Sequence, residues 1–203
     1  MRDTLPGTKR LNSWLSRDQV ETILRAPLKT PQGRRDLVVL RLGFSIGLRR
    51  QEIVDLDWPD LDHGQLRLVG KGGKAATVAV TPNTHIALDE WNTYLFGPGI
   101  LTPGLGPIVT SFRNWDGVQR PTGKRLSTNA IRDITVRYSQ ATGIRFAPHD
   151  MRRTFAGLLL DATGSIWQVS AALRHSNIGT TQRYLEQRQD AAAQAVTKAG
   201  FDV

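Results

Sequence analysis

PHDMRRTFAG, at residues 148–157, predicts a helix that enters the core of the protein and carries charged groups on one face. Proline suits the first turn of a helix, where its missing N–H would have no partner. His149 and Arg152 are three residues apart, so they share a face of this helix. The apolar run FAGLLL that overlaps its end is expected to pack in the core and to fix the helix in place. Taken alone, the same spacing is common on solvated helix faces.

On both sides of this stretch, helix signals alternate with turn residues. Serines and prolines stand where helices would begin, and glycines where they would end. Two β-type runs, QLRLV and ATVAV, flank the glycine turn KGGK and predict a hairpin. Residues 97–125 are rich in Gly and Pro and are expected to form a long loop around one short strand, PIVTS. The predicted helices cover residues 15–26, 31–46, 50–56, 82–95, 128–142, 148–162, 165–175 and 177–199.

These elements predict a mainly α domain with one small antiparallel β-sheet, an α+β fold, and the composition suits it. The 203 residues are 39% hydrophobic, carry a net charge of +9 and include no cysteine. Cysteine-free chains have neither disulfides nor thiolate metal sites, and four scattered histidines predict no structural zinc. The chain has no apolar run of about eighteen residues and no signal-peptide stretch at its start, so a cytoplasmic location is expected. The basic excess favours nucleic acid as partner.

Two further stretches are unusual for a simple helical domain. GLRRQEIVDLDW, at residues 47–58, places Arg49 and Arg50 directly after a glycine break in an apolar context. LRHSNIGTTQRYLE, at residues 173–186, holds a histidine and, nine positions later, a tyrosine. Taken alone, the first could be a surface pair at a helix start, and the second a helix-terminal histidine and a half-buried tyrosine. Together with residues 148–157 they give a specific order, which is Arg, a Gly-Lys-Gly hairpin, His-x-x-Arg, His and finally Tyr.

In this order and spacing the chain resembles the catalytic domain of the tyrosine recombinases, also called the phage-integrase-like or Xer-like family. The resemblance runs from about Leu15 to about Leu185 and implies the catalytic-domain fold of that family. It implies a single catalytic domain over 1–203, with a core of about 15–185 and a C-terminal helical tail of about 186–203. The N-terminal core-binding domain of the family is expected to be absent.

The resemblance also assigns residues to the site. The helix end after the first arginine is similar to the family's Leu-x-Trp-x-Asp pattern, and Glu52 matches its acidic partner. One position departs from the family, because Arg174 stands where a glycine usually precedes the later histidine. The neighbouring basic residues are expected to contact DNA phosphates rather than to react. The implied catalytic set is Arg49, Lys71, His149, Arg152, His175 and Tyr184, and the expected DNA contacts are Arg50, Lys74, Arg153 and Arg174.

Cleavage of a phosphodiester explains why the family uses these residue types. Two guanidinium groups can bind the nonbridging oxygens, on which charge builds in the transition state. Tyr184 would attack phosphorus, and His149 would accept its proton or position the phosphate. His175 would donate to a nonbridging oxygen, and Lys71 would protonate the leaving 5′ oxygen. The resulting 3′-phosphotyrosine conserves the bond energy, so the resemblance implies an enzyme that needs no cofactor, metal or ATP.

The expected function is therefore strand cleavage and rejoining in site-specific recombination. The expected partner is double-stranded DNA, on which family members assemble as tetramers, while this chain by itself is expected to be a monomer without a membrane partner. Two alternatives stay open at this point. The same residues could serve a type IB topoisomerase-like nicking and religating enzyme, or the chain could be a DNA-binding remnant without catalysis.

Overall fold

The computed structural model describes residues 14–69, 73, 75–97, 101 and 103–174. Within this part the protein is mainly helical with small antiparallel sheets, which confirms the predicted fold class. The expected helical tail lies outside the described residues. The elements are α1 (Arg17–Arg25), α2 (Pro31–Phe44), α3 (Arg50–Asp55), the 3-10 helix η1 (Trp58–Asp60), β1 (Leu61–Asp62), β2 (Gln65–Val69), β3 (Ala75–Ala79), α4 (Pro82–Phe96), β4 (Thr110–Trp115), β5 (Val118–Arg125), α5 (Thr128–Thr142), α6 (Pro148–Thr163) and α7 (Ile166–Leu173).

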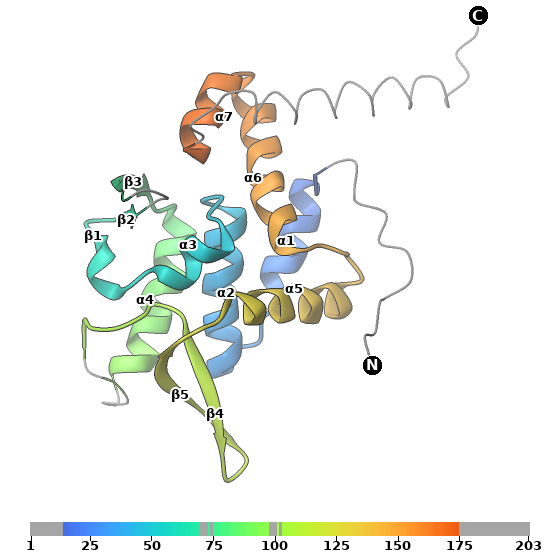
Figure 1. The fold of residues 1–203 in the computed structure, drawn as a ribbon. Coiled ribbons are helices and arrows are strands. Elements are labelled where there is room, and N and C mark those ends of the chain that lie inside the picture. The colour runs from blue at the N-terminus through green and yellow to red at the C-terminus, as the bar shows by residue number, and fades with distance from the viewer. Residues whose placement is uncertain (1–13, 70–72, 74, 98–100, 102, 175–203) are drawn as a thin grey trace, which may run out of the picture.

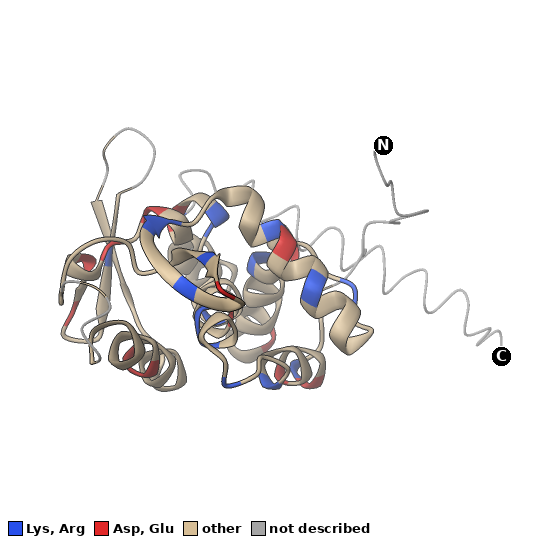
Figure 2. Cartoon of the chain, turned by 90° about the horizontal axis from the view of Figure 1, so that it is seen from below, with Lys and Arg blue, Asp and Glu red and all other residues tan. Residues whose placement is uncertain are grey.

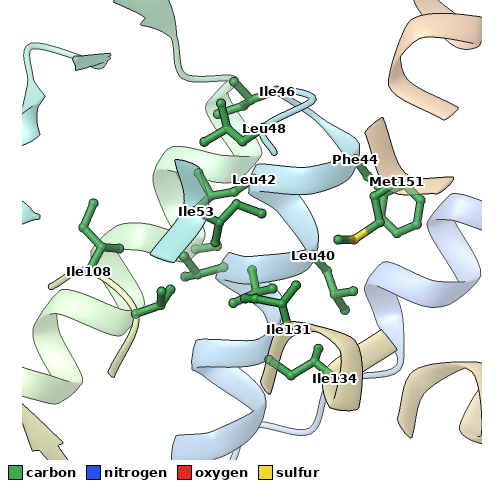
Figure 3. Close-up of a cluster of buried hydrophobic side chains, with 14 of the residues drawn as sticks. Leu40, Leu42, Phe44, Ile46, Leu48, Ile53, Ile108, Ile131, Ile134 and Met151 are labelled. Atoms are coloured by element: carbon green, nitrogen blue, oxygen red, sulfur yellow. The ribbon is translucent and has the colours of Figure 1, made fainter. Parts of the chain in front are cut away.

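Helix α2 is the centre of the core. It contacts α1, α3, α4, α6 and β5, and Figure 1 shows it between these elements. Its apolar side chains are buried on more than one face, which explains the nearly continuous run LVVLRLGF. Figure 3 shows Leu40 and Leu42 of α2 close to Ile53 of α3 and Ile131 of α5, with Met151 of α6 beside Phe44. Each fully buried side chain of this kind stabilises the fold by about 1.5–3 kcal/mol.

The predicted hairpin is present as part of a three-stranded sheet. Strand β2 pairs with β1 and with β3, and both pairings are antiparallel. Leu66 and Leu68 of β2 are buried while their neighbours are exposed, as expected of a strand with one face on the core. The turn between β2 and β3 includes Lys71 and Lys74, which lie outside the described residues.

The prediction for residues 97–125 was wrong. Instead of a long loop with one short strand, β4 and β5 form a second antiparallel sheet, so the domain has two small sheets in its described part. The hairpin projects from the body of the domain in Figure 1. Its turn is Asp116-Gly117, both with positive φ, as a type I′ hairpin turn requires. Most of β5 is exposed and polar, so it lacks the apolar alternation that reveals a strand.

A buried carboxylate connects α2 to α5. Asp36 is fully buried and accepts hydrogen bonds from Arg35 at 2.7 and 2.9 Å, from Arg137 at 2.5 Å and from the Tyr138 hydroxyl at 3.3 Å. Burial, followed by the charge of Asp36, raises the pKa of Tyr138 well above its ordinary value. Tyr138 is therefore a packing and hydrogen-bonding residue that stays protonated, not a nucleophile.

The turn between α2 and α3 brings α6 close. Gly47 has φ +70°, and a Cβ at this position would lie 2.3 Å from the ring of Phe155 on α6. Helix α2 ends at Phe44, before the glycine that was expected to interrupt it, and Ile46 and Leu48 on either side of Gly47 are buried. The glycine therefore lets α6 pack directly on the turn that leads to Arg49.

Substitution of Gly47 by alanine is expected to lower the free energy of unfolding by about 2–4 kcal/mol, because backbone strain and overpacking against Phe155 add. Gly143→Ala is the matched control, since Gly143 has φ +71° with nothing within 4 Å of its added Cβ. The free energy of unfolding of Gly143→Ala should fall by only about 1–2 kcal/mol, because backbone strain is its only cost. Chemical unfolding followed by circular dichroism measures both, and equal losses would show that the close approach of Phe155 is unimportant.

Candidate active site

Residues about a hundred positions apart in the sequence meet at one surface pocket. Arg49 is the N-cap residue of α3, and His149 and Arg152 lie in the first turns of α6. The structure thus brings together three of the six predicted catalytic residues. The other three, Lys71, His175 and Tyr184, lie outside the described residues. The lining residues are Leu48, Arg49, Arg50, Pro148, His149 and Arg152.

Arg152 is the most constrained side chain of the pocket. It is 4% exposed, and its guanidinium donates hydrogen bonds to the carbonyl oxygens of Gly47 and Leu173, each at 2.5 Å. A buried cation is costly unless it is hydrogen-bonded, so these carbonyls keep the charge inside the protein. They also connect the α2–α3 turn, α6 and the end of α7. Sequence reasoning missed both contacts, because backbone carbonyls leave no trace in residue identity.

Glu52 on α3 supplies the negative charge of the site. Its side chain is 10% exposed and accepts three hydrogen bonds, from the backbone N–H of Arg49 at 2.8 Å, from Arg49 Nη1 at 2.6 Å and from Arg174 Nη2 at 2.8 Å. Arg152 Nη1 is 3.8 Å from the same carboxylate. One carboxylate therefore faces three guanidinium groups, which leaves the cluster with an excess of positive charge. The predicted partnership of Glu52 with Arg49 is present in the structure.

The charges around Glu52 determine its protonation. Burial alone would raise its pKa, but the backbone hydrogen bond from Arg49 and the charges of Arg174 and Arg49 outweigh burial. The net effect is a pKa below the ordinary value of a glutamate, so the carboxylate is ionised at neutral pH. Because the folded-state pKa is depressed, this ion cluster stabilises the protein above the unfolded pKa of glutamate. That contribution is lost as the pH falls through the folded-state pKa.

His149 lies at the exposed rim of the pocket, at the start of α6. The first turn of this 16-residue helix also holds Asp150, which accepts a hydrogen bond from the N–H of Ala147 at 3.0 Å. Unpaired N–H groups and the dipole make a helix N-terminus favourable for anions. The carboxylate of Asp150 in the same turn offsets part of this effect, so the positive potential of the pocket rests mainly on the arginines.

The basic residues that were expected to contact DNA differ in their surroundings. Arg50 is exposed and lines the pocket, whereas Arg153 Nη1 lies 3.9 Å from a carboxylate oxygen of Asp150. Arg174 ends α7 in the left-handed conformation, with φ 55°, and its side chain is 14% exposed and paired with Glu52. Basic and acidic residues are otherwise interspersed over the described part of the chain (Figure 2).

In the part of the chain that the structure describes, His, Asp and Glu side chains nowhere gather in a group of three that could bind a metal ion. Every helix of that same part is too short or too polar to cross a lipid bilayer.

Known proteins match this chain over most of its length. Residues 13–190 match the family model described as the phage integrase family. A tyrosine recombinase XerC from Actinobacillus pleuropneumoniae is 30% identical over 88% of this chain, and one from Natranaerobius thermophilus is 32% identical over 89%. The chain spans only 56% and 60% of these relatives' lengths.

Solved structures show the same fold. The XerA recombinase matches with a TM-score of 0.69 and 20% identity over 94% of this chain and 66% of its own. The XerH recombinase in a post-cleavage complex with its difH substrate matches with a TM-score of 0.67 and 23% identity. The match covers 91% of this chain and 53% of the XerH chain. A lambda integrase tetramer on a Holliday junction matches with a TM-score of 0.60 and 19% identity. The match covers 85% of this chain and 47% of the integrase chain. By its sequence match and its fold, this chain belongs to the phage integrase family.

Proposed function

We propose that this chain cleaves and rejoins double-stranded DNA as the catalytic domain of a site-specific recombinase. The observation that carries the proposal is the meeting of Arg49, His149 and Arg152 in one cationic pocket, from segments about a hundred residues apart. Membership of the phage integrase family supports it, as do the DNA-bound recombinases among the matching structures. A phosphodiester suits this charge, because guanidinium groups bind phosphate oxygens in a forked manner.

The two arginines are preorganised for a phosphate. Arg152 donates to two carbonyl oxygens, and among the described residues the guanidinium of Arg49 has one hydrogen bond, to Glu52. The side chain of Arg49 is 45% exposed, so its other N–H groups can reach a bound anion. Donors that are fixed before the reaction stabilise the growing charge on the nonbridging oxygens without further reorganisation.

The proposed reaction is an in-line displacement at phosphorus. The hydroxyl of Tyr184 attacks the scissile phosphate, and its proton passes to His149 or to water held by His149. The bond from phosphorus to the 5′ oxygen breaks, and Lys71 protonates that oxygen. His175 donates to a nonbridging oxygen. The products are a 3′-phosphotyrosine and a free 5′-hydroxyl, and attack by another 5′-hydroxyl restores the DNA without ATP.

Partners and location follow from the proposal. Double-stranded DNA is the substrate, and assembly as a tetramer on two duplexes belongs to the longer protein, as the lambda integrase tetramer on a Holliday junction suggests by analogy. The chain would act where bacterial DNA lies, on the nucleoid in the cytoplasm. Of the alternatives, the recombinase is favoured over a topoisomerase-like enzyme because the matched relatives are XerC recombinases.

A covalent adduct tests the chemistry. The chain is incubated with a pool of nicked DNA duplexes whose sequence around the nick is randomised. Cleavage near the nick releases a short DNA end that diffuses away, so the covalent adduct cannot be rejoined. Wild type is expected to form an adduct that survives denaturation, and Tyr184→Phe is expected to form none while still binding DNA. An adduct in Tyr184→Phe would overturn the assignment of the nucleophile. Relaxation of plasmids without strand transfer between two DNA sites would favour the topoisomerase alternative.

The rate of adduct formation tests the role of the pocket arginines. Arg49→Ala is expected to slow adduct formation about 100- to 1,000-fold, because it removes a preorganised donor to the transition state. The control is Arg25→Ala, since Arg25 is an exposed arginine of α1 that is also paired with a glutamate. Its rate should match wild type. A loss of less than about threefold in Arg49→Ala, measured in single turnover, would remove Arg49 from the catalytic set.

Binding to DNA is expected to depend strongly on salt. Each phosphate contact releases counterions, so two or more contacts predict a loss of affinity of about tenfold or more between about 50 and 200 mM salt. Fluorescence anisotropy with a labelled duplex of random sequence measures this dependence. Equal affinity at both salt concentrations would contradict binding through the basic pocket.

A further inference from the structure

Arg174 occupies a backbone conformation that normally belongs to glycine. Helices α5 and α6 end at Gly143 and Gly164, with φ of 71° and 65°, while α7 ends at Arg174 with φ 55° and ψ 43°. A side chain is strained in this left-handed region, because its Cβ crowds the following carbonyl oxygen. Arg174 therefore needs a compensating interaction that the two glycines do not.

The side chain of Arg174 makes that interaction inside the protein. It is 14% exposed, and it donates to Glu52 at 2.8 Å and to the carbonyl oxygen of Ala172 at 3.1 Å. The bond to Glu52 spans 122 residues of sequence, so it joins the end of α7 to the first turn of α3. Arg174 is not among the described residues that line the cationic pocket, but it contacts Glu52, which in turn bonds the pocket residue Arg49.

The two carboxylate oxygens of Glu52 are divided between the arginines. Oε1 accepts from Arg49 Nη1, while Oε2 accepts from Arg174 Nη2 and from the backbone N–H of Arg49. With Oε2 occupied, the plane of the carboxylate is fixed and only Oε1 remains for the guanidinium of Arg49. Arg152 Nη1 lies 3.8 Å from Oε2, so without Arg174 the carboxylate of Glu52 could turn toward Arg152.

We propose that Arg174 is a positioning residue of the active site, which holds Glu52 so that Arg49 presents its remaining N–H groups to the scissile phosphate. The proposal rests on the proposed function. It assigns to Arg174 no contact with DNA and no contact with the reacting atoms. It also explains why an arginine is present at a strained position where glycine would suit the backbone.

The protonation of Glu52 gives a readout that a purely structural role would not move. Arg49, Arg152 and Arg174 face Glu52 from α3, α6 and the end of α7. On its other side Glu52 shares a surface hollow with Asp55, Asp60 and Arg67, of which the first two oppose the arginines electrostatically. The charge of Arg174 lowers the pKa of Glu52, so its removal raises that pKa. Protonated Glu52 would release Arg49 and slow cleavage. The fall of the cleavage rate on the acid side of its pH profile, the acid limb, would therefore occur at higher pH.

The test compares wild type with Arg174→Gly, Arg174→Lys and the control Arg25→Gly, which removes an exposed Arg–Glu pair at the end of α1. Glycine suits the left-handed conformation, so Arg174→Gly is expected to fold and to bind DNA with an affinity within about threefold of wild type. Its single-turnover rate on the nicked-duplex pool is expected to fall about 10- to 100-fold, because Arg49 is misplaced. The acid limb of the pH–rate profile of Arg174→Gly is expected at higher pH than that of wild type. The acid limb of Arg174→Lys is expected between these two, and that of Arg25→Gly is expected to match wild type.

The possible results separate the two proposals. If wild type forms no adduct, the proposed function fails and the role of Arg174 falls with it. If wild type forms the adduct and Arg174→Gly matches its rate and pH profile, only the inference is overturned. If the glycine variant does not fold, Arg174→Lys decides, because a wild-type rate and pH profile in that variant overturn the positioning role. A slower rate with an upward shift of the acid limb supports it.

Discussion

The ionised carboxylate of Glu52 is the constraint on which the pocket depends. Arg49, Arg152 and Arg174 all approach it, and without its charge three guanidinium groups would repel one another in a partly buried space. A site for a phosphodiester has to be cationic before the substrate arrives, and its arginines must nevertheless be held still. One negative charge meets both needs, because it fixes the arginines while leaving a net positive charge for the anion that binds.

Much of the fold could be predicted because the signals that end helices act locally. Ser16 and Ser165 accept hydrogen bonds from the first turns of α1 and α7, and Gly143 and Gly164 close α5 and α6 in the left-handed conformation. The hairpin of β4 and β5 escaped prediction because its strands are mostly solvent-exposed. Their apolar contact with the core is confined to the base of the hairpin, at Phe112 and its partner Pro121, so the sequence shows no alternation of apolar and polar residues.

The site was predictable only where residue order carries information. The sequence order indicated Arg49, His149 and Arg152, and the structure places all three at one pocket. The interactions that hold them were not predictable. The carbonyl of Gly47 is a backbone group, and the pairing of Arg174 with Glu52 depends on how the packing of α7 on α6 brings its C-terminal end to α3. Long-range geometry of this kind emerges only from the assembled fold.

The span of these contacts has a consequence during protein synthesis. A ribosome makes Glu52 and Arg49 first, Arg152 about a hundred residues later, and Arg174 later still. A nascent chain that ends before α6 lacks Arg152 and Arg174, which are two of the three arginines around Glu52 in the folded protein. Contacts so distant in sequence also form late in folding. Under the proposed function, a partly translated polypeptide would be unable to nick the chromosome beside which it is being made.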